Sequence, residues 1–490
     1  MLNIINKKKL EQLIEPHFHQ DLKLNDFEVK TIAASNLLTS KRFDLAFKLL
    51  YLEMKDSDVE FSKEFYQIHI GALSLGRFAE PGNEAKNSIE KFIREFNKTF
   101  ENIKLNGFDE NKTLIPLSKN GSIANGSHRV ASAIFLARDV QSVKIDADNH
   151  IYDYHFFQER GVSSNVLDVV ATKFISYSTN THIAFIWPSA VGHDKEVESF
   201  IPNIVYRKSI QLSKNGAHNL LSQIYFGEEW LGTVEDNFEG VEGKLVECFK
   251  NDKPVRVIAF HADSLNDVAK IKDEIRGIFN IDKHSIHITD TKVEADRVAR
   301  TVFNDNSVHF LNHARPNKYA STHKKVAAFK AFISNSDACH DDVLLDGSMV
   351  LSAYGIREAN DIDYFTNDNN KVDIQNDAFE CHDSELKYHD IEKLSLIYNP
   401  QYYFYFNDVK FVSFEQVYKM KKNRNETKDI ADCKMMEALL ENNKTKAMLN
   451  KLRQFFYYQK IKTRVSLIKF LRLVGLHSTL KFLYKLMVKK

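Results

Sequence analysis

The sequence LLDGS at positions 344–348, followed by DIDYF at positions 361–365, decides the expected fold of the last third of this chain. Gly347 lets backbone N–H groups approach an anion closely, and the Ser348 hydroxyl adds a further donor. Asp361 and Asp363 occupy alternate positions of a strand, so both side chains point to the same face of it. Carboxylate oxygens of this kind hold Mg²⁺ together with oxygens of substrate phosphates. The two stretches predict metal-assisted transfer at phosphorus, with Asp361 and Asp363 as the metal ligands.

The segment between the two stretches is long enough for a short helix over residues 352–358, with Gly355 near its end. A Gly-Ser turn, a helix and then Asp-x-Asp on a strand resemble the nucleotidyltransferase superfamily, whose fold is like that of DNA polymerase beta. The resemblance implies a nucleoside triphosphate or a nucleotide-activated donor as substrate and Mg²⁺ as cofactor. It also implies that Gly347, Ser348 and Arg357 bind nucleotide phosphates.

The block KMKKNRNETKDIADC at positions 419–433 strengthens this resemblance. Many bacterial members of the superfamily carry a similar series of lysine, arginine and Lys-Asp-x-x-Asp on a helix that follows the core sheet. The resemblance implies that the cations approach nucleotide phosphates and that the two aspartates orient them. The implied residues are Lys421 or Lys422, Arg424, Lys428, Asp429 and Asp432.

A third catalytic carboxylate is expected, and two residues remain as alternatives for it. Asp373 lies in the strand-like sequence KVDI, and Asp408 lies in the sequence YFNDV. We include Asp408 with Asp361 and Asp363 in the predicted catalytic set. The simpler alternative is an ordinary turn and an ordinary strand end. Because both features occur together with a basic block downstream, the sequence favours an active site.

Length and composition indicate a globular protein of roughly two to four domains. The chain has 490 residues, 43% of them hydrophobic, and a formal net charge of +1. Several apolar cores fit this length, and nucleic acid is not an expected partner of a chain so close to neutral. The four cysteines are widely spaced and form no metal-ligand pair, which indicates reduced thiols in a cytosolic protein. We expect neither a secretory signal nor an apolar segment of the roughly 20 residues that cross a bilayer.

Changes in pattern along the chain predict five regions. Residues 1–90 are expected to be mainly helical, with helices over 27–38 and 43–54, where apolar residues recur at helical spacing. The other four regions are a compact mixed domain, a central α/β domain, the nucleotidyltransferase-like domain and a basic amphipathic tail. These regions cover residues 91–164, 165–325, 326–445 and 446–490.

The mixed domain contains LIPL at positions 114–117, SIANGSHR at 122–129 and VKI at 143–145, with a turn and an apolar helix between them. This order resembles the ParB/sulfiredoxin-like fold, in which the equivalent Gly, His and Arg bind nucleotide phosphates and some members are kinases. Backbone N–H groups at the start of the helix would form an anion site in any case. The alternative is a His-Arg pair that only caps the helix, and the absence of a cysteine at Ser127 argues against sulfiredoxin chemistry. The residues that the resemblance implies are Gly126, Ser127, His128 and Arg129.

The central region alternates strands with helices. We expect strands over 182–186, 256–260, 284–288 and 307–311, and helices over 265–279 and 292–303. This alternation favours parallel strand-helix-strand units, whose ligands bind beyond the carboxyl ends of the strands. For Asp290 and Thr291, however, the favoured interpretation is that they cap the next helix. The polar residues predicted to line a pocket here are Ser189, His193, Asp263, Asp290 and His313.

The last forty residues contain eleven Lys or Arg and no Asp or Glu. Between Arg464 and Lys490, apolar residues recur at helical spacing among these cations, which is typical of helices that lie on an anionic membrane surface. The alternative is a terminal helix that docks on this protein or on a partner. We expect membrane-surface binding, which places the protein in the cytoplasm at the inner face of the membrane.

Together these patterns predict an α/β and α+β multidomain transferase. The leading hypothesis is a membrane-associated, Mg²⁺-dependent nucleotidyltransferase or phosphotransferase that acts on a saccharide or lipid-linked glycan in capsule or lipopolysaccharide biosynthesis. Its N-terminal nucleotide-binding domain would be kinase-like. Three alternatives stay open: a nucleotidyltransferase toxin or defence protein that modifies RNA or protein, a glycosyltransferase that uses the central domain, and a non-catalytic regulator that senses nucleotides.

Overall fold

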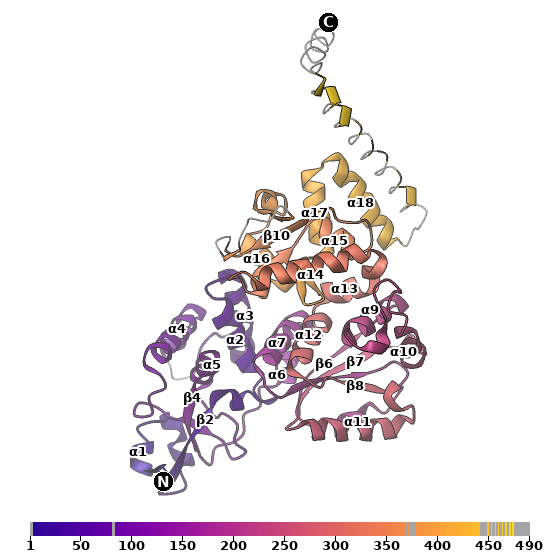
Figure 1. Ribbon diagram of the computed structural model, residues 1–490. Coiled ribbons are helices and arrows are strands. Elements are labelled where there is room, and N and C mark those ends of the chain that lie inside the picture. Colours follow the sequence, from indigo (N-terminus) through magenta and orange to yellow (C-terminus); the bar gives the residue numbers. More distant parts are fainter. Residues whose placement is uncertain are drawn as a thin grey trace.

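The computed structural model describes residues 3–80, 84–368, 371–372 and 378–441, together with single positions between 448 and 474. Helices and strands are mixed throughout, and the strands form three separate sheets that follow one another along the chain. Figure 1 shows an N-terminal part in indigo, a central part in magenta and a C-terminal part in orange. The prediction of a mixed α/β protein with several parts is confirmed at this level.

The first sheet has the strand order β1-β2-β4-β3. β1 (Asn3–Asn6), β2 (Asp26–Ala33) and β4 (Asp139–Lys144) pair antiparallel, and β3 (Ile115–Leu117) joins β4 in parallel. Strands from both sides of the boundary predicted at residue 90 therefore belong to one sheet.

The helix predicted over residues 27–38 is wrong. These residues form β2 and a short 3-10 helix, η2 (Ala34–Leu37). In β2 the buried Phe27 and Val29 alternate with exposed side chains, because one face of the strand packs on a core. The same apolar residues also fit helical spacing, which explains the error. The helix predicted over 43–54 is confirmed by α2 (Asp44–Met54).

α2 is the central helix of the N-terminal part, and ten of its eleven residues are buried. α3 (Val59–Ser74), α5 (Ser127–Phe135) and α7 (Ser164–Tyr177) pack against it, and α4 (Ile89–Asn106) packs against α5. Charged side chains on α2 must therefore find partners inside the protein.

The carboxylate of Asp44, on α2, is the centre of a buried ionic cluster. Arg42 donates Nε and Nη2 to its two oxygens at 2.8 and 2.9 Å, and Lys48 Nζ donates at 2.9 Å. His69 Nε2 lies 3.3 Å from Lys48 Nζ. None of these four side chains is more than 3% exposed. Burial opposes the charge of Asp44, but the neighbouring cations hold the pKa of this carboxyl well below its usual range.

The second sheet has the order β6-β7-β5-β8, and all neighbouring strands are antiparallel. The prediction of parallel strand-helix-strand units is therefore wrong. β5 and β7 are almost entirely buried on both faces, and each contains a run of four apolar residues of the kind that parallel sheets also contain. The four strands are β5 (Thr181–Ile186), β6 (Ile204–Ile210), β7 (Val255–His261) and β8 (Ile286–Ile288).

Two predicted helices of the central part are confirmed by α11 (Leu265–Phe279) and α12 (Lys292–Val302). The strand predicted over 307–311 is wrong, because these residues lie in α13 (Asp305–His313). The buried residues of α13 recur at helical spacing, and Asn304 caps the helix through the Ser307 N–H. The other helices of this part are α6 (Tyr154–Glu159), α8 (Asp194–Phe200), α9 (Lys214–Ile224) and α10 (Val241–Cys248).

The third sheet has the order β11-β10-β9-β13-β12. β9 pairs antiparallel with β10 and parallel with β13, while β11 joins β10 in parallel and β12 joins β13 antiparallel. The strands are β9 (Val343–Leu345), β10 (Ile362–Thr366), β11 (Phe379–Cys381), β12 (Tyr403–Phe406) and β13 (Val409–Val412). α15 (Ser348–Ala353) and α16 (Lys393–Tyr398) contact β10, α12 and α13 contact β12, and α14 (Ala320–Ser334) packs against α15.

The basic block at 419–433 was expected on one helix, but it spans two, α17 (Phe414–Arg424) and α18 (Thr427–Leu440). Asn425 ends α17 in a left-handed conformation with φ +53°. Glu426 and Asp429 then form a capping box that starts α18.

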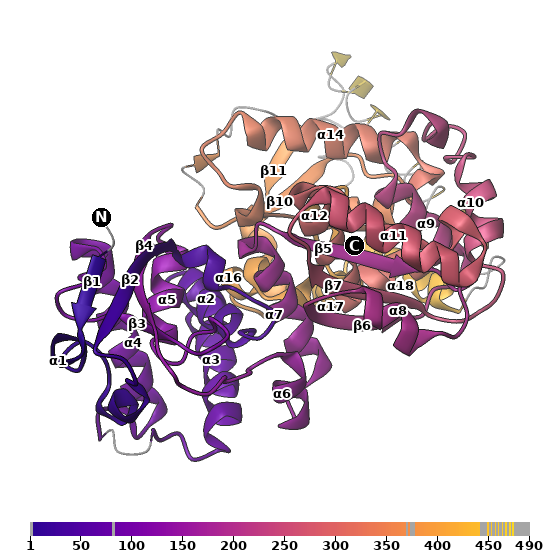
Figure 2. The same cartoon turned by 90° about the horizontal axis from the view of Figure 1, so that it is seen from below.

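One apolar cluster extends through all three parts of the chain and includes Phe47, Phe174, Phe185 and Phe411. α7 contributes to it from a position between the helices of the N-terminal part and the central sheet, as Figure 2 shows. All three sheets therefore contribute to one cluster, and the first two sheets each pack against a second, smaller cluster. Among the residues that the structure describes, no helix is long and apolar enough to cross a membrane.

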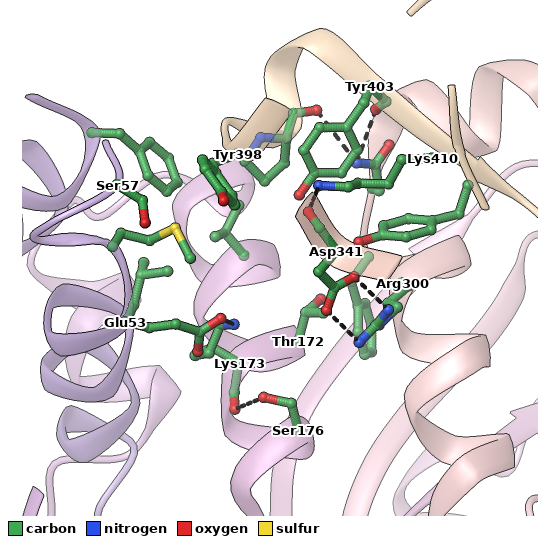
Figure 3. Close-up of a pocket in the computed structure, with 18 of the residues that line it drawn as sticks. Glu53, Ser57, Thr172, Lys173, Ser176, Arg300, Asp341, Tyr398, Tyr403 and Lys410 are labelled. Atoms are coloured by element: carbon green, nitrogen blue, oxygen red, sulfur yellow. Dashed lines mark hydrogen bonds and ion pairs between the residues drawn. The ribbon is translucent and has the colours of Figure 1, made fainter. Parts of the chain in front are cut away.

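A cavity of about 340 Å³ lies where the three parts meet, and Figure 3 shows the charged side chains in its wall. Lys173 of α7 contacts Glu53 of α2 at 2.6 Å. Arg300 of α12 binds Asp341, just before β9, through two hydrogen bonds of 2.9 and 3.1 Å. These ion pairs join different parts of the chain, so the wall of this cavity is held together by matched charges.

Asp44→Asn is expected to lower the free energy of unfolding by about 3–5 kcal/mol, because it leaves two buried cations without their carboxylate. Chemical denaturation followed by circular dichroism measures the change. Asp56→Asn is the matched control, since the Asp56 side chain is 83% exposed and its ion pair with Lys55 lies at the surface. Equal midpoints for the two variants would show that the buried cluster does not stabilise the fold.

Candidate active site

The two sequence stretches meet where β9 ends and the chain turns into α15. Gly347 occupies this turn with φ +56° and ψ −119°, a conformation that favours glycine. A Cβ atom at this position would lie 2.7 Å from Asp363 Oδ2. Ser348 donates its hydroxyl to Asp361 Oδ1 at 2.9 Å. The structure therefore brings all four of these predicted residues together.

Glu380 is a further carboxylate at this site, and sequence reasoning missed it. β11 pairs with β10 so that Glu380 lies opposite Asp363. Paired residues on neighbouring strands lie about 5 Å apart and place their side chains on the same face. Glu380 and Asp361 are both exposed, whereas Asp363 between them is nearly buried. The strand that carries Glu380 has only three residues, which is too short for a periodic pattern to identify.

Asp346, the last residue before Gly347, is fully buried and binds two histidines. His382 Nδ1 donates to Asp346 Oδ2 at 2.9 Å, and His389 Nε2 donates to the same oxygen at 3.1 Å. His382 Nε2 also lies 4.0 Å from Asp363 Oδ2. Asp346 Oδ1 is buried and has no hydrogen-bond partner in the described part of the chain. His382 therefore lies between the fully buried carboxylate of Asp346 and the less buried carboxylate of Asp363.

The charges in this cluster shift three pKa values. Burial opposes the charge of Asp346, but the two histidines hold its pKa well below the usual range. Burial opposes the charge of His382 as well, but its hydrogen bond to Asp346 raises the pKa of this imidazole. Burial and the neighbouring carboxylates raise the pKa of Asp363 to about 6, although His382 acts in the opposite direction. A cation bound beside Asp363 would relieve the repulsion among the carboxylates.

The residues fit a Mg²⁺ ion of the kind that accompanies nucleotides. Such an ion takes oxygen ligands and commonly uses one or two protein carboxylates, with water and substrate phosphates as the other ligands. Asp361 and Asp363 supply these carboxylates, and burial first and the neighbouring carboxylates second raise the pKa of Asp363. No group of three or more Asp, Glu, His or Cys placed to bind a metal occurs within the described ranges. A metal here would therefore depend on oxygens of the substrate.

Lys421 and Arg424 of the basic block, together with Arg357, bind carboxylates of the same part of the chain. Lys421 Nζ lies 2.9 Å from Asp432 and 3.4 Å from Asp429, and its side chain is 2% exposed. Arg424 binds Asp429 through two hydrogen bonds of 2.8 and 2.9 Å. Arg357 binds Asp432 in the same way. The predicted phosphate-binding roles of these five residues conflict with this buried, mutually paired arrangement.

α17 instead supports the segment that carries the two histidines. Arg424 reaches Glu385 at 2.9 Å, and Gln416 Nε2 donates to the backbone oxygen of His389 at 2.7 Å. Lys428 remains partly exposed and lies 3.3 Å from Glu426, while Lys422 lies over the ring of a tyrosine on α17. The phosphate-binding roles of Lys422 and Lys428 stay predictions.

Asp408 lies at the other end of the same sheet. It occupies the turn between β12 and β13 with φ +62° and lies 3.6 Å from Lys330 Nζ. β13 runs parallel to β9, so the start of β13 lies beside the start of β9, whereas Gly347 follows the end of β9. The prediction of Asp408 as the third catalytic carboxylate is therefore wrong. The alternative, Asp373, lies outside the described residues.

The second predicted nucleotide site, at the start of α5, is filled by its own side chains. Arg129 Nη2 binds Glu15 at 2.8 Å, and a Cβ atom on Gly126 would lie 2.8 Å from the same nitrogen. His128 Nε2 lies 2.8 Å from a tyrosine hydroxyl of α3, and burial holds the pKa of His128 well below its usual range. α5 begins at Ser127. At neutral pH the His128 imidazole beside this helix start is neutral, and the Arg129 guanidinium is paired with Glu15. The alternative of a His-Arg pair engaged within the protein fits this geometry better, although neither side chain caps α5, whose N-cap is Gly126.

The polar residues predicted to line one pocket in the central part are spread over several places. Asp263 and Asp290 line two different cavities. His193 contacts Glu196 of the same helix at 2.8 Å, and Ser189 donates to a backbone oxygen of α10 at 2.6 Å. The His313 ring packs on its neighbour on α13, with centroids 4.5 Å apart. Thr291 caps α12 by accepting from the Glu294 N–H, as predicted.

Comparison with known proteins adds no constraint on this site. No protein-family model, curated protein or solved structure matches the chain. The assignment of the site therefore depends on its residues and their geometry.

Gly347→Ala is expected to destabilise the protein and to displace the Asp363 carboxylate, because the new Cβ atom would meet Asp363 Oδ2 at 2.7 Å. Left-handed strain alone costs about 1–2 kcal/mol in a residue other than glycine. Gly121→Ala is the matched control, since Gly121 has φ +84° and no atom within 4 Å of an added Cβ. Denaturation measures both variants, and equal losses would mean that the contact with Asp363 is unimportant.

Proposed function

We propose that this chain is a Mg²⁺-dependent nucleotidyltransferase or phosphotransferase whose active site lies at the end of β9. The observation that carries the proposal is the approach of the Gly347 turn to Asp363, with the bond between Ser348 and Asp361 beside it. A turn without a side chain leaves room for a phosphate group next to two carboxylates that suit a metal.

The order of elements supports a nucleotidyltransferase-type fold for the C-terminal part. β9, α15 and β10 follow one another, with the Gly-Ser turn after the first strand and the carboxylates at the start of the second. In the N-terminal part, β3, α5 and β4 follow one another, and the two strands are parallel, which supports a ParB/sulfiredoxin-like arrangement. We propose no kinase activity for the N-terminal part, because His128 and Arg129 are engaged with neighbouring side chains.

Each residue of the site has a distinct role in this proposal. Asp361 and Asp363 hold Mg²⁺, which when bound neutralises phosphate charge and aligns the donor for in-line attack. Ser348 positions the Asp361 carboxylate, and the backbone at Gly347 accommodates a phosphate oxygen. Glu380 accepts the proton of the attacking hydroxyl, since it is exposed on the same face as Asp363.

The acceptor that we propose is a hydroxyl of a saccharide or lipid-linked glycan at the inner face of a membrane. The described positions of the tail include Leu467, Phe470 and Leu473, whose side chains are 56, 60 and 87% exposed. Apolar residues three positions apart give a helix one apolar side, as in helices that bind membrane surfaces. Most of the predicted membrane-binding segment between Arg464 and Lys490 lies outside the described residues.

The double variant Asp361→Asn with Asp363→Asn is expected to lower turnover by about a thousandfold or more, because the metal loses both protein carboxylates. The assay incubates the protein with Mg²⁺ and each nucleoside triphosphate, CDP-alcohol or sugar nucleotide, and identifies the products by mass. Asp408→Asn is the matched control, since Asp408 lies at the other end of the sheet. Equal turnover in the double variant and the wild type would reject the site. Labelled RNA or protein among the products would instead favour the toxin or defence alternative.

The affinity for Mg²⁺ in the presence of a non-hydrolysable nucleotide is expected to rise as the pH increases through about 6, because Asp363 must lose its proton and its pKa is raised to about 6. In the metal-free protein the raised pKa means that protonated Asp363 stabilises the fold at low pH. This contribution is lost as the pH rises from the unfolded-state value of about 4 to about 6. Calorimetric titration over this range measures the affinity, and a value independent of pH would contradict the assignment of Asp363 as a ligand.

A further inference from the structure

A separate cavity of about 570 Å³ lies in the central part, beside the edge strand β8, and residues of α9, α10, α11 and α12 line it. Five cations and three carboxylates line it, so positive charge exceeds negative charge by two. The cations are Lys244, Lys272, Arg276, Lys283 and Arg297, and the carboxylates are Glu228, Asp290 and Glu294. The excess of positive charge distinguishes this cavity from the one at the junction of the three parts.

Two of the three carboxylates already have partners in the wall of the cavity. Lys272 Nζ contacts Asp290 Oδ1 at 2.6 Å. His287 Nε2 contacts Glu294 Oε1 at 3.0 Å. Of the carboxylates in the wall, only Glu228 then remains to balance the other cations, Lys244, Arg276, Lys283 and Arg297.

The guanidinium groups of Arg276 and Arg297 each contain a buried nitrogen, Nε, that lacks a hydrogen-bond partner in the described part of the chain. Arg276 contacts Asp273 at 3.3 Å, but Asp273 is 76% exposed, so this pair is weak. Buried charged donors without an acceptor are unfavourable, and a ligand oxygen is one way to satisfy them.

Lys244 lies in an environment that a bound anion would stabilise. Its Nζ donates to the Tyr225 hydroxyl at 2.8 Å and lies 4.4 Å from the centre of the Tyr225 ring. Burial, together with the positive charges of Lys283 and Arg276, lowers the pKa of Lys244. The cations of this wall are therefore close enough to repel one another, and an anion between them would remove this repulsion.

We propose that this cavity is a second ligand site that binds a nucleoside diphosphate or triphosphate through Lys244, Arg276, Lys283 and Arg297. Two adjacent phosphate groups match several convergent cations, and guanidinium groups bind phosphate oxygens in a fixed geometry. The volume lies in the range of small-molecule sites. Phe226, which is half exposed in the wall, offers an aromatic face to the base.

The proposal is tested on the full-length protein by titration with ATP, UTP, inorganic pyrophosphate and adenosine in EDTA, where Mg²⁺-dependent binding at the C-terminal site is suppressed. Trp230 lies 5.1 Å from Tyr225 between ring centres and is partly exposed, whereas the other tryptophan, Trp187, is buried. Tryptophan fluorescence should therefore change on binding, and Trp230→Phe should abolish the change. We expect the two nucleotides and pyrophosphate to bind and adenosine not to bind.

Lys244→Gln combined with Lys283→Gln is expected to weaken ATP binding about a hundredfold, since each charge-assisted contact contributes about tenfold or more. Lys270→Gln is the matched control, because Lys270 is an exposed cation of α11 outside the cavity wall and should leave binding unchanged. Lys283→Arg keeps the charge and should keep most of the affinity. Thermal melting confirms that each variant is folded.

Binding at this cavity must also be independent of the C-terminal site. The variant with Asp361→Asn and Asp363→Asn should bind ATP in EDTA as tightly as the wild type. Loss of ATP binding in that variant would place the ligand at the C-terminal site and overturn the proposal. Absence of saturable nucleotide binding, or affinity unchanged by the two lysine substitutions, would overturn it as well.

Discussion

The buried carboxylate of Asp346 is the interaction on which the geometry of the C-terminal site depends. A charged group removed from water is tolerated only when donors surround it, and His382 and His389 are the two donors that the fold provides. Both histidines come from a segment that α17 fixes through Arg424 and Gln416. Asp346 directly precedes Gly347, and its backbone N–H donates to the Asp363 backbone oxygen at 2.9 Å, so it lies where the Gly347 turn meets Asp363.

From the sequence, only those residues of the C-terminal site that lie in short, recognisable stretches could be predicted. Gly347, Ser348, Asp361 and Asp363 were found because a turn and an alternating strand leave a short, recognisable pattern. Glu380 was not found, because its place beside Asp363 is decided by strand pairing across an intervening segment. The sequence also does not show which lysine and arginine side chains are exposed and which are buried. The sequence therefore predicts Lys421 and Arg424 at a phosphate, although the structure pairs both with aspartates.

The errors in the fold have a similar physical origin. Periodicity identified α2, α11 and α12, whose apolar residues lie on continuous faces or fill a long buried helix. The strands predicted over 182–186 and 256–260 are likewise confirmed by β5 and β7, but the alternation of strands with helices predicted the wrong sheet direction. Periodicity failed in short segments such as 307–311, where a few apolar residues fit a strand and a helix equally well.

The largest apolar cluster receives side chains from all three sheets, and this sharing affects how the chain can be divided, although the first two sheets each pack against a second, separate cluster as well. A domain joined to its neighbours by a linker can be cut out and still keep its core. Here α7 and the residues around the junction contribute to the packing of more than one sheet, so excision of any one part would expose apolar surface on the others. The three parts should therefore stabilise one another, and a fragment that lacks one of them should expose apolar surface and be more prone to aggregate than the whole chain.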